Sequence, residues 1–109
     1  MIVDSHCHLI HEKNTLSVEK IIQKAKNNDV TTLLNITTKQ DEFDRSIQLT
    51  EKYNAIYTSI GIHPHDSSEM NQKVYNKILE LCNHEKVIGI GETGLDYYYN
   101  NSLREEQIN

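Results

Sequence analysis

The 109-residue sequence lacks the features that mark membrane, secreted and disulfide-rich proteins. No apolar run approaches the ~18 residues that a membrane-spanning helix needs. Nothing resembles a signal peptide, because Asp4 interrupts the apolar start and no cationic segment leads into a long apolar one. The cysteines, Cys7 and Cys82, lie far apart and form no metal or redox motif, so we interpret them as reduced thiols of a cytoplasmic protein.

The sequence also lacks a surplus of basic residues, since its formal net charge is -5. This balance excludes a nucleic-acid-binding surface that depends on the charge of the whole chain. A nuclease is still compatible with it, because bound divalent cations supply local positive charge. The content of 37% hydrophobic and 25% charged residues is ordinary for a globular protein, and the length allows one domain with a modest core.

Four short runs rich in apolar and β-branched residues alternate with helical patterns, and no linker or low-complexity tract interrupts them. The expected strands are residues 2–9, 31–37, 55–62 and 86–92. The first expected helix follows Ser17, a suitable N-cap, and places its apolar residues at the spacing of one helical face. Further helical faces lie around Phe43 and around Val74, and a fourth helix begins near Ser102.

The alternation of strands and helices predicts an α/β fold with a parallel sheet and outer helices. Four β-α units are half of an eight-stranded TIM barrel, which takes about 250 residues in full. We therefore expect residues 1–109 to form a single partial domain, the N-terminal half of such a barrel, with 64–71 as its longest loop. Its first and fourth strands are then open edges, which favour pairing with a missing C-terminal half or with a second copy of the chain.

Active sites of such barrels lie at the C-terminal ends of the strands, where this sequence collects metal-binding side chains. His6 and His8 share one face of the first strand, with Asp4 below them. Two adjacent imidazoles can chelate a divalent cation; the alternative is a pair of surface histidines. Glu92 ends the fourth strand, where a carboxylate is costly unless it is paired or binds a cation, and a helix cap is the alternative.

Other polar residues near these ends allow two interpretations each. His63 and His65 follow the third strand and contact a phosphate or a metal-bound water, or else shape the rim of the loop. Asp96 orients a ligand or caps a turn, and Asp4 supports the histidines or accepts hydrogen bonds from backbone amides. Tyr97 and the two tyrosines after it stack on nucleobases or pack beneath a loop.

Three motifs, in this order along the chain, resemble the signatures of the TatD family of metal-dependent deoxyribonucleases. They are residues 2–9 (IVDSHCHL), 61–65 (GIHPH) and 88–98 (IGIGETGLDYY). The resemblance covers the whole chain, and three ordered motifs are together highly specific. It implies a TIM barrel of the metal-dependent hydrolase superfamily.

The resemblance also implies a metal site and an activity. His6 and His8 would bind one of two divalent cations, and Glu92 would bridge to the second, with Mg²⁺, Mn²⁺ and Zn²⁺ all compatible with these ligands. The implied reaction is hydrolysis of phosphodiester bonds in DNA, with a metal-activated water as the nucleophile. Glu92 and His63 are the expected catalytic residues, and His63 is expected to contact the substrate phosphate.

The sequence departs from the family pattern in two ways. Ile10 stands where the family commonly has aspartate or asparagine, and the family's later histidines and aspartate have no counterpart in this sequence. We therefore expect the chain alone to be inactive. One alternative is a cyclic-amide hydrolase, which Glu92 disfavours because those enzymes commonly carry a modified lysine at that position. The other alternative is a non-catalytic remnant or metal-binding module.

Overall fold

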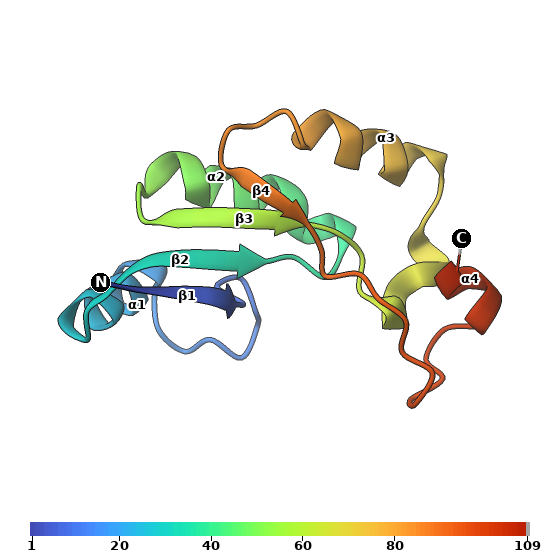
Figure 1. The fold of residues 1–109 in the computed structure, drawn as a ribbon, viewed down its shortest axis with the longest axis horizontal. Coiled ribbons are helices and arrows are strands. Elements are labelled where there is room, and N and C mark those ends of the chain that lie inside the picture. The colour runs from blue at the N-terminus through green and yellow to red at the C-terminus, as the bar shows by residue number, and fades with distance from the viewer. Residues whose placement is uncertain (109) are drawn as a thin grey trace.

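The computed structural model describes residues 1–108, and these form a parallel sheet with the strand order β1-β2-β3-β4 (Figure 1). The elements follow one another along the chain as β1 (Ile2–Cys7), α1 (Val18–Asn27), β2 (Val30–Ile36), η1 (Gln40–Glu42), α2 (Phe43–Lys52), β3 (Ile56–Ile60), η2 (Pro64–Glu69), α3 (Gln72–Leu81), β4 (Val87–Ile90) and α4 (Arg104–Ile108). The α/β alternation and the parallel sheet of a half-barrel are thus confirmed. No helix within residues 1–108 is long and apolar enough to cross a membrane.

Local sequence explains where the helices begin. The hydroxyl of Ser17 accepts a hydrogen bond from the backbone N–H of Lys20 at the start of α1, as its N-cap position predicts. The side chain of Asn71 caps α3 in the same way. The expectation of a loop over 64–71 was wrong in part, because η2 occupies most of it: Pro64 provides a fixed φ at its first turn, and the His63 side chain caps it.

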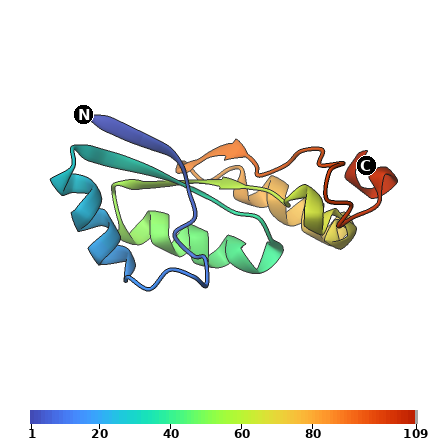
Figure 2. The same cartoon turned by 90° about the horizontal axis from the view of Figure 1, so that it is seen from below.

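Three of the helices cover one face of the sheet, as the turned view in Figure 2 shows for α1, α2 and α3. Two apolar clusters fill this interface. The first contains Phe43, Ile60, Ile62, Val74, Ile78 and Leu81, and the second contains Leu9, Leu33 and Ile56. The radius of gyration is 14.6 Å, above the ~13 Å of a typical domain of about 100 residues, which reflects an open, one-sided sheet.

The inner and outer strands pair differently. β2 and β3 stay in register from Leu33 opposite Ile56 to Ile36 opposite Ser59. In contrast, the register shifts between Asp4 and Cys7 where β1 pairs with β2, and again where β3 begins to pair with β4. Such irregularities bend a strand and change where its side chains point, and they are frequent beside functional sites.

Candidate metal centre

The C-terminal end of β1 presents two histidines side by side. The ring centroids of His6 and His8 lie 5.1 Å apart, with the ring planes at 76°. The Nδ1 atom of His8 lies 3.1 Å from the carbonyl oxygen of Ile36, so this nitrogen carries the proton and Nε2 keeps its lone pair. A hydrogen bond at the opposite ring nitrogen is the usual way in which proteins orient a metal-binding imidazole. His8 is therefore oriented to bind a cation through Nε2.

Cys7 lies between the two histidines in sequence but is unsuited to join them. Its thiol donates a hydrogen bond to the carbonyl oxygen of Leu34, at 3.4 Å, on the neighbouring strand. Burial, and secondarily the charge of Asp4, raises the pKa of Cys7 to about 12, so the metal-binding thiolate does not form at neutral pH. Asp4 accepts a hydrogen bond from the backbone N–H of His6, at 3.1 Å.

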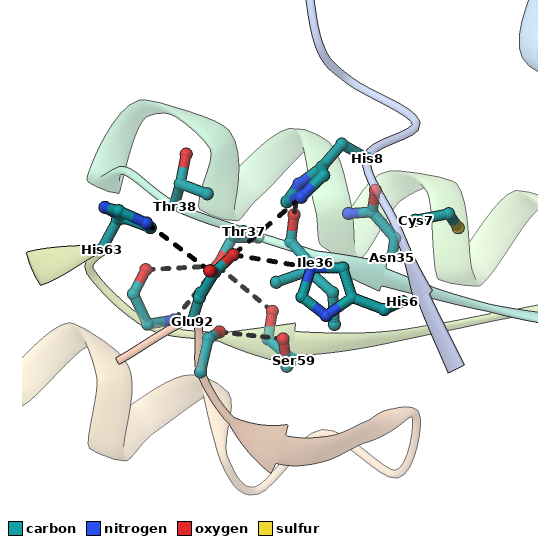
Figure 3. Close-up of polar contacts among 12 residues, drawn as sticks. His6, Cys7, His8, Asn35, Ile36, Thr37, Thr38, Ser59, His63 and Glu92 are labelled. Carbon is teal, nitrogen blue, oxygen red and sulfur yellow. Dashed lines mark hydrogen bonds and ion pairs between the residues drawn. The ribbon is translucent and has the colours of Figure 1, made fainter. Parts of the chain in front are cut away.

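Glu92 follows β4 and is positioned by the two central strands. Its backbone N–H donates to the carbonyl oxygen of Thr37, at 2.9 Å, and the N–H of Gly91 donates to that of Ile60, at 3.0 Å. The hydroxyl of Ser59 donates to the carbonyl oxygen of Gly91, at 2.8 Å. These bonds fix the backbone of Gly91 and the N–H of Glu92, and the carboxylate is directed towards the end of β1 (Figure 3).

The two histidines and the glutamate converge from opposite edges of the sheet. The Oε2 atom of Glu92 lies 3.6 Å from the Nε2 atom of His6 and 3.9 Å from that of His8. Zn²⁺ takes nitrogen and oxygen ligands at about 2.0–2.2 Å, which places two ligands of a tetrahedral site about 3.4 Å apart. The three side chains thus fit one divalent cation. No other group of three histidine, cysteine or acidic side chains within residues 1–108 converges in this way.

His63 approaches the same carboxylate from the other side (Figure 3). Its Nε2 atom lies 3.5 Å from the Oε1 atom of Glu92, and its Nδ1 atom accepts a hydrogen bond from the backbone N–H of His65, at 3.1 Å. The proton of the neutral ring is therefore on Nε2, the reverse of the His8 tautomer. His63 is thus arranged to donate a hydrogen bond to an oxygen atom, whereas His8 is arranged to bind a cation.

An open hollow of about 360 Å³ connects these groups. It is lined by His6, His8, His11, Thr38, His63, Asp66 and Glu92. The sequence-based interpretation left His11 and Thr38 outside the site, and the structure places both in the wall of the hollow. The arrangement provides ligand atoms, a hydrogen-bond donor and open space at one end of the sheet.

The other expected residues form a second group beside this hollow. The Nε2 atom of His65 lies 2.6 Å from the Oδ2 atom of Asp96. This hydrogen bond is the main reason that the pKa of Asp96 lies below its ordinary value, and the backbone N–H of Tyr98 adds to the effect. Tyr97 lies under the guanidinium of Arg104, whose central carbon is 4.5 Å from the ring centroid. These residues join the loops after β3 and β4 and are not part of the His6–His8–Glu92 group.

Sequence reasoning missed the buried polar residues that hold β1 in place. Asn35 is fully buried; its Oδ1 atom accepts from the backbone N–H of Leu9, at 2.8 Å, and its Nδ2 atom donates to the hydroxyl of Ser46, at 2.7 Å. The hydroxyls of Ser46 and Thr58 lie 2.6 Å apart. The available signal was the polar end of an otherwise apolar strand, where a buried amide side chain indicates hydrogen bonds to neighbouring segments.

Comparison with known proteins shows the family of the chain. A family model described as TatD related DNase matches residues 3–109. The uncharacterized metal-dependent hydrolase YabD of Bacillus subtilis is 36% identical over 107 residues, which are 98% of this chain and 42% of that protein. The 3'-5' ssDNA/RNA exonuclease TatD of Escherichia coli is 37% identical over 75 residues, which are 69% of this chain and 29% of that protein. The chain thus spans less than half the length of these relatives.

Solved structures give the same result for the fold. The crystal structure of the TatD homologue YjjV from Escherichia coli superposes with a TM-score of 0.84 at 27% identity, covering 97% of this chain and 42% of that one. A TatD-family hydrolase from Entamoeba histolytica gives a TM-score of 0.80 at 27% identity. Metal-dependent hydrolases thus recur among the relatives. Because the family model matches almost the whole sequence, the chain belongs to the family of TatD-related DNases.

Proposed function

We propose that the chain provides His6, His8 and Glu92 as the ligands of a divalent cation in a hydrolase that cleaves phosphodiester bonds of DNA. The observation that carries this proposal is the convergence of two imidazole nitrogens and a carboxylate oxygen, all within 4.8 Å of one another. The convergence lies at the C-terminal edge of a parallel sheet, where barrel enzymes of this type perform their chemistry. The chain covers only 42% of the length of its Bacillus relative, so the hydrolytic activity is itself part of the proposal.

Each side chain has a distinct role in this proposal. His6 and His8 hold the cation through their Nε2 atoms, and the Oε2 atom of Glu92 completes the set. The Oε1 atom of Glu92 faces the opposite side, 3.5 Å from the Nε2 atom of His63, and would be the carboxylate oxygen left for a second cation. A divalent cation at this place, Mg²⁺, Mn²⁺ or Zn²⁺, supplies positive charge to phosphoryl oxygens and lowers the pKa of water.

His63 acts on the substrate rather than on the cation. Because Nδ1 accepts the N–H of His65, the Nε2–H of His63 is the available donor, and it is directed into the hollow beside Glu92. A non-bridging phosphate oxygen is a suitable acceptor for this donor. The proposal therefore separates the ligands at the end of β1 from a phosphate-contacting histidine after β3.

Two further points complete the proposal. The Escherichia coli relative is called an ssDNA/RNA exonuclease, which supports a nucleic acid as the substrate. We place the protein in the cytoplasm, because Cys7 and Cys82 are both free thiols. Because the net charge is -5, the bound cations, and not a basic surface, would be the main attraction for phosphate.

Metal binding by the purified chain tests the proposal most directly. We expect Glu92→Gln to weaken the binding of Mn²⁺ or Zn²⁺ by at least about tenfold, since the substitution removes a charged ligand and keeps its shape. Glu85→Gln is the matched control, because Glu85 is exposed in the loop before β4, away from the hollow. Equal affinities of all three proteins in calorimetry would contradict the assignment of the ligands.

Hydrolysis of single-stranded DNA, measured on the same proteins, shows whether the chain alone is active. Metal-dependent cleavage that is lost in Glu92→Gln and retained in Glu85→Gln would support a hydrolase that works without further residues. Metal binding without cleavage is the result expected of the chain alone, and it also fits the alternative of a metal-binding module whose reaction needs additional residues. The exposure of the His6 side chain, 55%, keeps this alternative open, because an exposed site can bind a cation without excluding water from it.

A further inference from the structure

A continuous series of aromatic rings leads from Glu92 to the surface of the molecule. The ring centroids of His63 and His65 lie 4.3 Å apart, those of His65 and Tyr99 lie 5.6 Å apart, and those of Tyr99 and Tyr98 lie 4.8 Å apart. All three pairs meet edge to face, at angles of 75° to 83°, which is a favourable geometry for aromatic side chains. The series thus extends from His63, in the wall of the hollow, to the two tyrosines at the surface.

The outer end of this series is exposed although its rings are large and mostly apolar. Tyr98 is 83% exposed and Tyr99 is 64% exposed. Both belong to the segment between β4 and α4, which extends beyond the C-terminal ends of the strands (Figure 1). Neither tyrosine belongs to an apolar cluster of the core. Burial in the apolar core therefore does not account for the placement of the two rings.

The segment that carries the tyrosines is held firmly by hydrogen bonds. The Oδ1 atom of Asp96 accepts from the backbone N–H of Tyr98, at 2.9 Å, and Oδ2 lies 2.6 Å from the ring of His65. Gln107 donates to the carbonyl oxygen of Asp96, at 2.9 Å, and accepts from its N–H, at 2.7 Å. The hydroxyl of Ser102 donates to the carbonyl oxygen of His65, at 2.7 Å. The segment is thus tied to the loop after β3.

This combination of rigidity and exposure is what a binding surface for flat ligands requires. A ring that is already fixed loses little conformational entropy when a ligand stacks on it. Arg104, the first residue of α4, lies over the ring of Tyr97, which precedes the two tyrosines in the same segment. Two acids of this region are engaged, since Asp96 binds His65 and Glu106 accepts the N–H of Leu103, at 3.1 Å.

We propose that Tyr98 and Tyr99 form a stacking platform for the bases of a single-stranded nucleic acid whose backbone extends to the His6–His8–Glu92 group. This inference rests on the proposed hydrolysis of nucleic acids and names the part of the substrate that the exposed rings bind. Stacking on tyrosine does not depend on the base sequence, because every base has an aromatic face. The platform therefore binds strands of any sequence, in DNA or in RNA.

The experiment compares two fluorescein-labelled oligonucleotides of equal length and charge. One is oligothymidylate, and the other is an abasic strand that keeps the backbone but has no bases. Both carry phosphorothioate linkages, which resist hydrolysis, and binding to the chain is followed by fluorescence anisotropy with Mg²⁺ present. We expect the abasic strand to bind at least about fivefold more weakly, since stacking contributes about 1–3 kcal/mol per base. A uridylate strand is expected to behave like the thymidylate strand.

Variants then assign the difference to the tyrosines. The double variant Tyr98→Leu/Tyr99→Leu is expected to lose at least about fivefold in affinity for oligothymidylate and to bind both strands alike. Tyr98→Phe/Tyr99→Phe keeps the rings and is expected to keep the binding. Tyr75→Leu is the control for an exposed tyrosine elsewhere, because Tyr75 is 50% exposed on α3. Circular dichroism of each variant checks that it is folded.

Three results would overturn the platform. These are equal binding of the two strands by the unmodified chain, no measurable binding of either, and an unchanged preference in the leucine double variant. None of them bears on the metal ligands, which are tested by Glu92→Gln. Conversely, a chain that stacks bases but does not hydrolyse DNA would retain the platform and lose the proposed reaction.

Discussion

The two central strands and the two outer strands of the sheet have opposite characters. In β2 and β3, Asn35, Ile56 and Thr58 are fully buried, whereas Val3 in β1 and Ile90 in β4 are more than half exposed. The contrast is sharpest for one pair of identical residues. Ile60 and Ile90 are direct partners in the sheet, yet their exposed fractions are 0% and 65%.

The candidate metal ligands lie on the exposed outer strands or directly after them. His6 and His8 lie at the end of β1, and Glu92 follows β4, but the contacts that orient them come from β2 and β3. The carbonyl oxygen of Ile36 orients His8, and that of Thr37 holds the backbone of Glu92. The centre of the sheet thus provides stability and alignment, while its edges carry the chemistry.

The largest expected effect separates the two partners in the sheet. Ile60→Ala should lower the free energy of unfolding by about 2–5 kcal/mol, because it leaves a cavity in the buried cluster. Ile90→Ala, the matched variant, should cost less than about 1 kcal/mol, because its side chain is mostly in solvent. Urea unfolding measures both. Equal losses would mean that the outer face is covered in solution, and the contrast would then fail.

The next effect concerns the contact between β3 and β4. A Cβ atom on Gly61 would lie 2.6 Å from the carbonyl carbon of Gly91, so Gly61→Ala forces apart the backbone next to Glu92. We expect a loss of about 1–3 kcal/mol in unfolding free energy, together with weaker metal binding. Gly89→Ala is the control, since its Cβ would meet only the side chain of Ser59, at an ordinary 3.8 Å. Equal behaviour of the two variants would show that the close contact is absent in solution.

The smallest expected effect tests whether the central strand β2 aligns the metal ligands at the end of the edge strand β1. Asn35→Ala removes the acceptor for the backbone N–H of Leu9, next to His8, and should weaken Co²⁺ binding by about tenfold. Thr50→Ala also deletes a buried polar group, but its hydroxyl donates only to Ile47 in its own helix. Both variants are expected to unfold more easily. Only Asn35→Ala is expected to change the affinity for Co²⁺ and the absorption spectrum of bound Co²⁺, both measured well below the unfolding temperature. An unchanged spectrum in Asn35→Ala would assign the residue to stability alone.

Much of the fold follows from local patterns. The spacing of apolar residues after Ser17 predicts α1, and the structure begins that helix at Val18. The strands were placed well, but all except the second were expected to be longer, because an apolar run does not show where a strand leaves its partner: the run at 2–9 gives a strand that ends at Cys7. Leu9 then turns towards the helices and is held by Asn35.

The candidate site was less accessible to sequence reasoning. The metal-binding character of His6, His8 and Glu92 was visible from their chemistry, and their assignment as ligands stays a prediction for the metal-binding experiment. The opposite tautomers of His8 and His63 were not visible, because each depends on a hydrogen bond that the folded backbone provides. The pairing of His65 with Asp96 likewise joins residues from two different loops.

The order of the strands and helices, the Ser17 cap and the three motifs of the family follow from the amino-acid sequence alone, because these depend on residues that are neighbours along the chain. In contrast, the folded sheet is needed to bring Glu92 opposite His6 and His8, and to leave Tyr98 and Tyr99 in solvent. Those outcomes depend on the register of β1 and β4 against the central strands. The physical reason is that contacts between distant residues are set by packing and hydrogen bonds across the sheet, which no local pattern contains.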